Sequence, residues 1–168
     1  MAGEWGALAK AALSSILRWL PGRVLRWWYP IGKCQESLTV EAHGVGPHIF
    51  VNADRAPAIV GMKVSLMNGL PFSVKVESLH LEVSLESRGL TNHDHSVKES
   101  VLGGGVLQIG ISDIHLSDGQ AGIVRQHLNE CPVLKISGHL SCETVAGDFS
   151  KPLQLETRAF IFRGGDNR

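Results

Sequence analysis

The chain has 168 residues, 43% of them hydrophobic and 19% charged, which is typical of a folded globular chain long enough for one domain. Its three cysteines are odd in number and have no metal-binding spacing, so they fit a reducing compartment better than a secreted disulfide framework. Sixteen basic residues balance sixteen acidic ones, but residues 1–33 hold five basic side chains against Glu4 alone, a local net charge of +4. This asymmetry indicates an interacting head on a separately folded body.

The head, residues 1–30, holds all four tryptophans and has the pattern of a cationic amphipathic helix. Apolar side chains recur at i, i+3, i+4 and i+7 as far as Leu20, and a second short piece follows Pro21. Large apolar side chains opposite Lys and Arg are typical of a helix that lies in a membrane interface. We expect these side chains to contact the membrane: Trp5, Leu8, Leu13, Ile16, Leu17, Trp19, Leu20, Leu25, Trp27 and Trp28. We expect these to contact lipid headgroups: Lys10, Arg18, Arg23 and Arg26.

The head is too short to cross a bilayer as a helix. Its longest uncharged apolar run before Pro21 is 11–17, whereas a span needs about 20 apolar residues. Charges inside the apolar stretch also argue against a cleaved signal peptide. Two alternatives remain open: the stripe packs on the body or on a copy of itself, or its basic and aromatic residues bind nucleic acid. Nucleic acid would leave the aliphatic stripe unused, so we expect an anionic membrane surface and no nucleic-acid partner.

The body, from Ser37 onward, has alternating rather than helical hydrophobicity. A phase change at Glu77-Ser78 predicts a β-bulge or a crossing between sheets, and the last two strands are expected to pair across a turn near 146–148. Several short strands with frequent turns favour an antiparallel sandwich or barrel. The predicted strands lie within 38–42, 49–51, 62–66, 72–76, 79–85, 106–111, 134–142 and 153–161.

One helix is predicted near 118–129, because Ser117 and Gln120 have the spacing of a capping box and Cys131-Pro132 ends the segment. It is either a binding lid or, as we favour, a plug that covers the open end of the sandwich. The chain then divides into the head (1–30), a linker (31–36), a β-sandwich domain (37–162) and a disordered tail (163–168).

The segment from Val64 to Leu85, VSLMNGLPFSVKVESLHLEVSL, resembles the central part of the late-embryogenesis-abundant family, also called the water-stress and hypersensitive-response domain. In that family a strand ends in Asn, a turn with Pro follows, and a long alternating strand begins after Phe or Ile. The resemblance covers about residues 40–162. It implies an immunoglobulin-like β-sandwich with no catalytic residues and a stabilising, adaptor or membrane-associated role.

The residues that resemble a reaction centre are few. His93-Asp94-His95 has the residue types of a metal site, but polar neighbours suggest a solvated loop tip, so we expect no metal. No Gly-x-Ser-x-Gly elbow is present, and Gly103-Gly104-Gly105 lacks the Lys and Ser/Thr of a phosphate-binding loop. We therefore expect no enzyme activity, no cofactor and no small-molecule substrate.

The sequence predicts a non-enzymatic peripheral membrane protein, in which an immunoglobulin-like antiparallel sandwich with one inserted helix serves as an interaction or scaffold module. Its N-terminal amphipathic helix tethers it to an anionic membrane, on the cytoplasmic face. The alternative is a soluble component of a protein assembly whose N-terminal helix docks in a partner's groove. Binding to a bilayer depends on both a broad apolar area and positive charge, whereas a protein groove binds a narrow apolar stripe.

Overall fold

A computed structural model describes residues 22–43, 48–52, 59–128 and 130–164 of the chain. This part is mainly β, as predicted, and its strands form two sheets. The helices are α2 (Gly22–Trp28), α3 (Ile31–Ser37) and α4 (Asp118–Gln126). The strands are β1 (Leu38–Ala42), β2 (His48–Asn52), β3 (Ile59–Asn68), β4 (Val74–Leu85), β5 (Arg88–Val101), β6 (Val106–His115), β7 (Val133–Thr144), β8 (Phe149–Arg158) and β9 (Phe160–Gly164).

Sheet A contains β1, β2, β3, β6 and β9, and β3 is its central strand. Strand β6 pairs antiparallel along one edge of β3, while β1 and β2 pair with successive parts of the other edge. Strand β9 joins the sheet in parallel with β2. Sheet B is antiparallel throughout, in the order β5-β4-β7-β8. Both pairings of β4 shift register between Val76 and Ser78, which confirms the bulge predicted from the change of phase.

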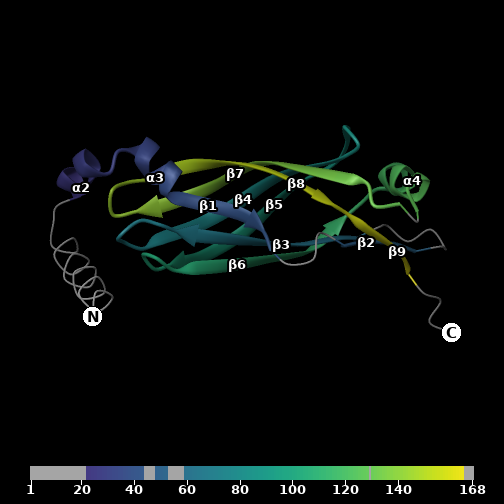
Figure 1. Cartoon of the computed structure of the whole chain (residues 1–168), viewed down its shortest axis with the longest axis horizontal. Coiled ribbons are helices and arrows are strands. Elements are labelled where there is room, and N and C mark those ends of the chain that lie inside the picture. Colours follow the sequence, from purple (N-terminus) through teal and green to yellow (C-terminus); the bar gives the residue numbers. More distant parts are fainter. Residues whose placement is uncertain (1–21, 44–47, 53–58, 129, 165–168) are drawn as a thin grey trace, which may run out of the picture.

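The two sheets form two layers that share one hydrophobic core (Figure 1). Alternation puts one face of each strand inward, as in β4, where every second side chain is buried on either side of the bulge. The largest fully buried side chains are Leu25, Leu38, Ile49, Leu66, Leu70, Leu79, Leu81, Leu85, Leu90, Ile111, Ile114 and Leu116.

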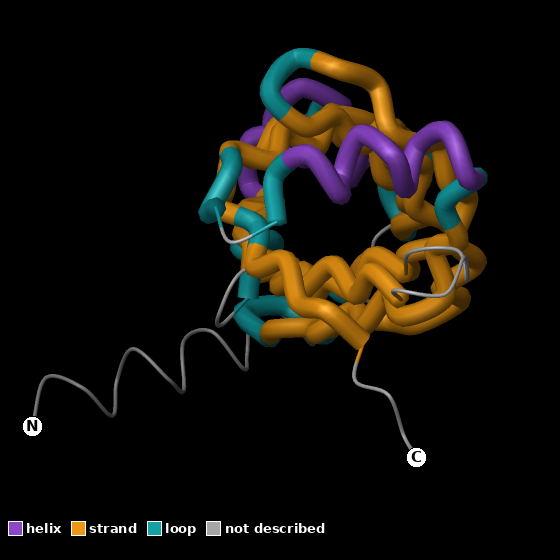
Figure 2. Tube along the Cα trace, turned by 90° about the vertical axis from the view of Figure 1, so that its right-hand side faces the viewer, coloured by secondary structure: helices purple, strands orange, loops and turns teal. Residues whose placement is uncertain are grey.

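Helix α4 lies across one end of this double layer, the end that faces the viewer in Figure 2. Its predicted capping box is present, because the Ser117 hydroxyl accepts from the Gln120 N–H and the Gln120 side chain accepts from the Ser117 N–H. Ala121 and Val124 are buried in the shared core. The helix therefore closes this end of the sandwich, as the plug interpretation expects.

The loop-tip prediction for His93-Asp94-His95 is wrong, because these residues lie in the middle of β5. This strand forms an edge of sheet B, and its inward positions opposite Leu79 and Leu81 are occupied by His95 and His93. Polar inward side chains are a common feature of edge strands, where they discourage pairing with other chains. They also remove the apolar alternation by which a strand is recognised.

Two boundaries also differ from the prediction. Residues 31–36, expected to be a linker, belong to helix α3. Strand β8 pairs with β7 as expected, but after Ala159 the chain changes sheets, and β9 runs as far as Gly164 alongside β2. Residues 165–168, the remainder of the predicted tail, lie outside the described residues.

Candidate functional site

The exposed large hydrophobic side chains of the described residues gather at the end of the sandwich opposite α4, which we call the apolar end. Strand register defines this end: Met67 pairs with Val106 in sheet A, and Val74 pairs with both Val101 and Thr144 in sheet B. Helices α2 and α3 lie at the same end (Figure 1). The exposed side chains are Val24, Trp27, Trp28, Ile31, Met67, Leu102, Val106 and Val145.

Helix α2 is fixed to the body by one apolar and one polar contact. Leu25 is only 1% exposed and packs with Ala146 and Phe72, and the Arg26 Nε donates to the Ala146 carbonyl over 2.6 Å. Tyr29, just after the helix, contacts the Phe72 ring edge-on at 5.2 Å between centroids. Leu25 was expected to contact the membrane, and its burial corrects that expectation: it holds the helix on the sandwich.

The burial of Leu25 determines where the two tryptophans of α2 point. A helix turns by about 100° per residue, so the residue two positions later faces almost the opposite way. Trp27 is accordingly 81% exposed, and Trp28, three positions after Leu25, is 50% exposed. Together with Tyr29 and Lys33 they line a shallow depression of about 400 Å³. Both indole rings are thus available at the surface.

Helix α3 connects this surface to β8. The Gln35 side chain donates to the Ser150 carbonyl over 2.6 Å, and the Lys151 Nζ donates to the Gln35 carbonyl over 2.7 Å. Cys34 faces inward and donates its thiol hydrogen to the Tyr29 carbonyl. Burial raises the pKa of the Cys34 thiol, an effect that the nearby Lys33 ammonium partly offsets. This protonated, buried thiol supports the packing of α3 and is a poor nucleophile.

Asn68 organises the turns of the apolar end from inside. Its side chain is fully buried; the amide nitrogen donates to the carbonyls of Phe72, Val101 and Leu102, and the amide oxygen accepts from the Leu70 N–H. The Asn68 main chain also bonds Gly104 and Gly105 across the β5–β6 turn. One side chain therefore fixes two turns, and with them the exposed position of Leu102.

Positive charge at this surface comes from α2 and α3. Arg23, Arg26 and Lys33 are all exposed, although the Arg26 Nε is already engaged with the body. Lys33 also lies 4.7 Å from the centre of the Tyr29 ring. The remaining predicted contacts lie outside the described residues: Trp5, Leu8, Lys10, Leu13, Ile16, Leu17, Arg18, Trp19 and Leu20.

Several surface residues were missed by the sequence analysis. Ile31 was assigned to a linker and Val106 to a strand, and no role was predicted for Met67, Leu102 or Val145. Met67, Leu102, Val106 and Val145 are single apolar residues at strand ends or in turns, where no periodicity marks them. The signal that could have found Leu102 is its position beside three glycines, since a large apolar residue in such a turn has little local structure to pack against.

The histidine cluster does not converge on a point. The His93 and His95 rings stack at 6.0 Å between centroids on the inward side of β5. Asp94 points to the opposite face, where its carboxylate lies 2.6 Å from the His80 Nδ1. Among the residues that the structure describes, no group of three or more His, Cys, Asp or Glu side chains is arranged to hold a metal ion.

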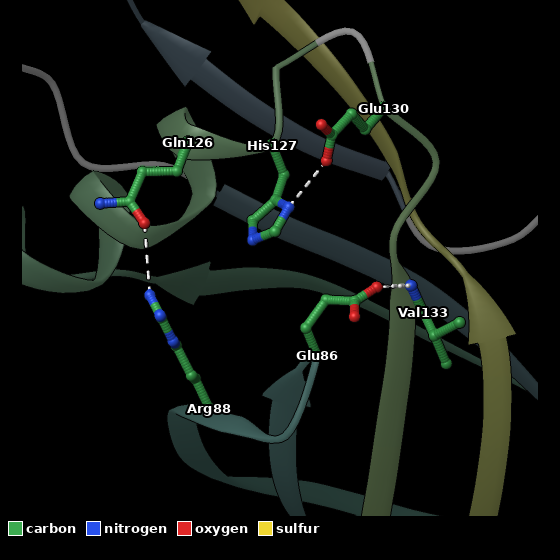
Figure 3. Close-up of polar contacts among 6 residues, drawn as sticks. All are labelled: Glu86, Arg88, Gln126, His127, Glu130 and Val133. Carbon is green, nitrogen blue, oxygen red and sulfur yellow. Dashed lines mark hydrogen bonds and ion pairs between the residues drawn. The ribbon is translucent and has the colours of Figure 1, made fainter.

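The end that α4 covers carries several polar contacts between neighbouring residues (Figure 3). The Glu86 carboxylate accepts from the Val133 N–H, Arg88 donates to the Gln126 side chain, and the His127 ring pairs with Glu130 at 2.9 Å. This end thus differs in kind from the apolar end. None of the helices within the described ranges is long and apolar enough to cross a membrane.

Comparison with known proteins gives a likeness of fold. No family model and no curated protein matches the chain. A protein from Arabidopsis thaliana, solved in solution, has a TM-score of 0.56 and 13% identity, covering 77% of this chain and 81% of its own. A protein classed provisionally with the late embryogenesis abundant (LEA) proteins has a TM-score of 0.53 and 13% identity, covering 89% of this chain and 86% of its own.

The likeness is one of fold. The resemblance inferred from residues 64–85 is therefore confirmed at that level, since the solved structures similar to this chain include an LEA-type protein. Asn68, the strand-ending Asn of that resemblance, is the residue whose buried side chain fixes the turns of the apolar end.

Proposed function

We propose that this chain is a non-enzymatic peripheral membrane protein, held at an anionic membrane surface by its N-terminal head, which includes helix α2. The observation that carries the proposal is the orientation of α2. The helix is fixed to the sandwich by Leu25 and Arg26, yet it presents Trp27 and Trp28 to solvent beside Arg23 and Lys33. The exposed surface of these two indole rings contributes little to the stability of the fold.

The chemistry of this surface suits a lipid interface. Indole rings favour the boundary between headgroups and hydrocarbon, because they combine a large apolar area with one N–H donor. Burial of apolar area contributes about 25 cal/mol per Å², and each basic residue near an anionic surface adds about 1 kcal/mol. Two tryptophans and three cations can thus supply several kcal/mol, which the apolar stripe of residues 1–20 would increase.

The sandwich itself serves, in this proposal, as an interaction or scaffold module with an immunoglobulin-like arrangement. Support for that arrangement comes from the two sheets around one core and from the chain crossing between sheets at Ala159. The proposed location is the cytoplasmic face of a membrane. The three cysteines are all free, and Cys34 and Cys142 are buried, which suits a reducing compartment.

The proposal is tested by sedimenting the full chain with vesicles of phosphatidylcholine and phosphatidylserine. Trp27→Ser/Trp28→Ser should weaken binding strongly, and Arg23→Ser/Lys33→Ser should weaken it only on anionic vesicles and mostly at low salt. The matched control is Lys135→Ser/Arg158→Ser, which removes two exposed cations from sheet B, away from the head. Failure of the unmodified chain to bind these vesicles would refute the proposal and favour a protein groove as the target of the head.

A further inference from the structure

A second apolar surface lies at the same end as α2 but belongs to the sandwich itself. We call it the β5–β6 tip and define it as Leu102 in the turn, with Met67 and Val106 at the adjoining strand ends. Leu102 is 69% exposed, Val106 60% and Met67 49%. Met67 and Val106 are directly opposite each other across the β3–β6 pair, so their side chains lie on the same face.

The tip is held in place by the interior of the protein. The Leu102 carbonyl accepts from the buried Asn68 side chain, and Gly104 donates from its main chain to the Asn68 carbonyl over 2.7 Å. Gly104 adopts a φ of 75°, a conformation that favours glycine, and a Cβ on Gly103 would meet the main chain of Leu70 and Pro71. The turn therefore has one well-defined shape, and this shape presents Leu102 to the outside.

The tip also lacks charge. From Val101 to Ser112 the chain contains no Asp, Glu, Lys or Arg. Insertion of a charged side chain into the headgroup–hydrocarbon boundary would cost free energy of desolvation, and this segment avoids that cost. Its apolar side chains project from a turn and from two strand ends, a shape that a fluid bilayer can accommodate.

The position of the tip relates it to the proposed membrane contact of α2. The described chain begins with Gly22 at this end, and the segment before it carries the apolar stripe and the basic residues Lys10 and Arg18. A membrane bound by the head and by Trp27 is thus adjacent to this end of the sandwich and not to the α4 end. The lipid surface is therefore the occupant that the arrangement favours.

We infer that the β5–β6 tip is a second membrane contact, so that the sandwich stands with its apolar end against the bilayer and α4 faces water. The inference rests on the proposed function but goes beyond it, because contact through α2 alone would leave the sandwich free to tilt about that helix. A second contact on the same body restricts this tilt, and it forms at a high effective concentration once the first contact is made.

In the test, an environment-sensitive fluorophore is attached to single cysteines introduced into the full chain. The exposed Cys131 is replaced by Cys131→Ser, whereas Cys34 and Cys142 are buried and so are not labelled. The labelled positions are Leu102→Cys at the tip, Ser96→Cys on the outer face of sheet B, and Gly119→Cys on α4. When vesicles that contain phosphatidylserine and brominated acyl chains are added, the emission of the label at position 102 should shift to shorter wavelength and be quenched. The labels at 96 and 119 should stay in water.

A functional readout accompanies the labels. Leu102→Ser/Val106→Ser should weaken vesicle binding about tenfold, because binding then no longer transfers these two exposed apolar side chains from water into the bilayer. Both side chains are at the surface, so the variant should unfold at nearly the same urea concentration as the unmodified chain. The matched control, Asn92→Ser/Ser96→Ala, changes an exposed part of β5 and should bind normally.

The outcomes separate this inference from the proposed function. If the chain binds vesicles while the label at 102 stays in water, the inference is wrong and the proposed function stands. Quenching at 96 as well would mean that the sandwich lies on its side, which also overturns the inference. If the label at 102 is shielded before vesicles are added, and the protein elutes as a dimer, the tip is an interface between copies. If no vesicle binding occurs, the proposed function itself fails.

Discussion

The two ends of the sandwich solve the same problem in different ways. Any double layer of strands exposes apolar side chains at its open ends, and both ends here are covered by helices. At the α4 end, Ala121 and Val124 seal the core, and Arg88 and His127 each contact a neighbouring polar side chain. At the apolar end, Leu25 and Cys34 seal the core, yet Trp27 and Leu102 remain outside. Closing an end therefore does not require exposed apolar residues, so those at the apolar end call for another explanation.

The largest expected effect comes from removing the side chain that shapes the apolar end. Asn68→Ala should lower the free energy of unfolding by about 3 kcal/mol, because it removes a fully buried side chain that donates to the carbonyls of Phe72, Val101 and Leu102. Urea denaturation of the full chain measures this loss. Asn92→Ala, an exposed position on β5, is the control and should change stability by less than about 0.5 kcal/mol. A loss below about 1 kcal/mol for Asn68→Ala would show that the turns hold their shape without it.

The next effect separates the inner side of α2 from its outer side. Leu25→Ala should destabilise the protein by about 2 kcal/mol, since it removes a buried side chain from the contact with Ala146 and Phe72. Trp27→Ala removes a larger side chain but should leave stability within about 0.5 kcal/mol of the unmodified value, because that side chain packs against little. Equal losses for the two variants would mean that Trp27 belongs to the core.

A smaller effect is expected at the α4 end. Ser117→Ala should cost about 1 kcal/mol, because the substitution removes the cap of the Gln120 N–H. Ser112→Ala, which changes an exposed serine of β6, is the matched control. Neither variant should change vesicle binding, because both sites lie away from the apolar end. A cap variant that bound vesicles more weakly would contradict the separation of the two ends.

The smallest effect is expected from metal ions. Zinc should leave the midpoint of thermal unfolding unchanged, and His93→Ala/His95→Ala should not alter that result. The reason is geometric: the two rings stack on one side of β5 while Asp94 pairs with His80 on the other. Stoichiometric zinc in the purified protein, lost in the double variant, would show that a site forms there after all.

Local sequence patterns predict much of the fold, and the strands that they fail to predict were missed for physical reasons. Alternation predicts β3, β4 and β7, and the broken phase at Glu77 predicts the bulge, because these strands have one buried face. Strand β5 escapes prediction because its inward positions at an open edge are polar. The parallel pairing of β9 with β2 escapes because it joins segments more than a hundred residues apart, with no local signal.

The sequence predicts only part of the candidate site, because local patterns do not show which side chains pack inward. The composition after Pro21, rich in tryptophan and arginine, places this piece in the head and so finds Trp27 and Trp28. It does not say which apolar residue packs inward, because both sides of this short helix carry large apolar side chains. Leu25 is therefore assigned to the membrane until its contact with Ala146 is known. Leu102 and Val145 lie in turns, where exposure depends on the tertiary structure alone.

The central claim is that α2, fixed on the sandwich, faces a membrane with its tryptophans. Because all four tryptophans lie in the first 28 residues, Trp5→Phe/Trp19→Phe leaves Trp27 and Trp28 as the only indole reporters. The most direct measurement is the emission of this full-length variant as vesicles containing phosphatidylserine are added. The account predicts a blue shift and quenching by brominated lipid. Emission that stays at its solvent-exposed wavelength while the protein sediments with the vesicles would contradict the account.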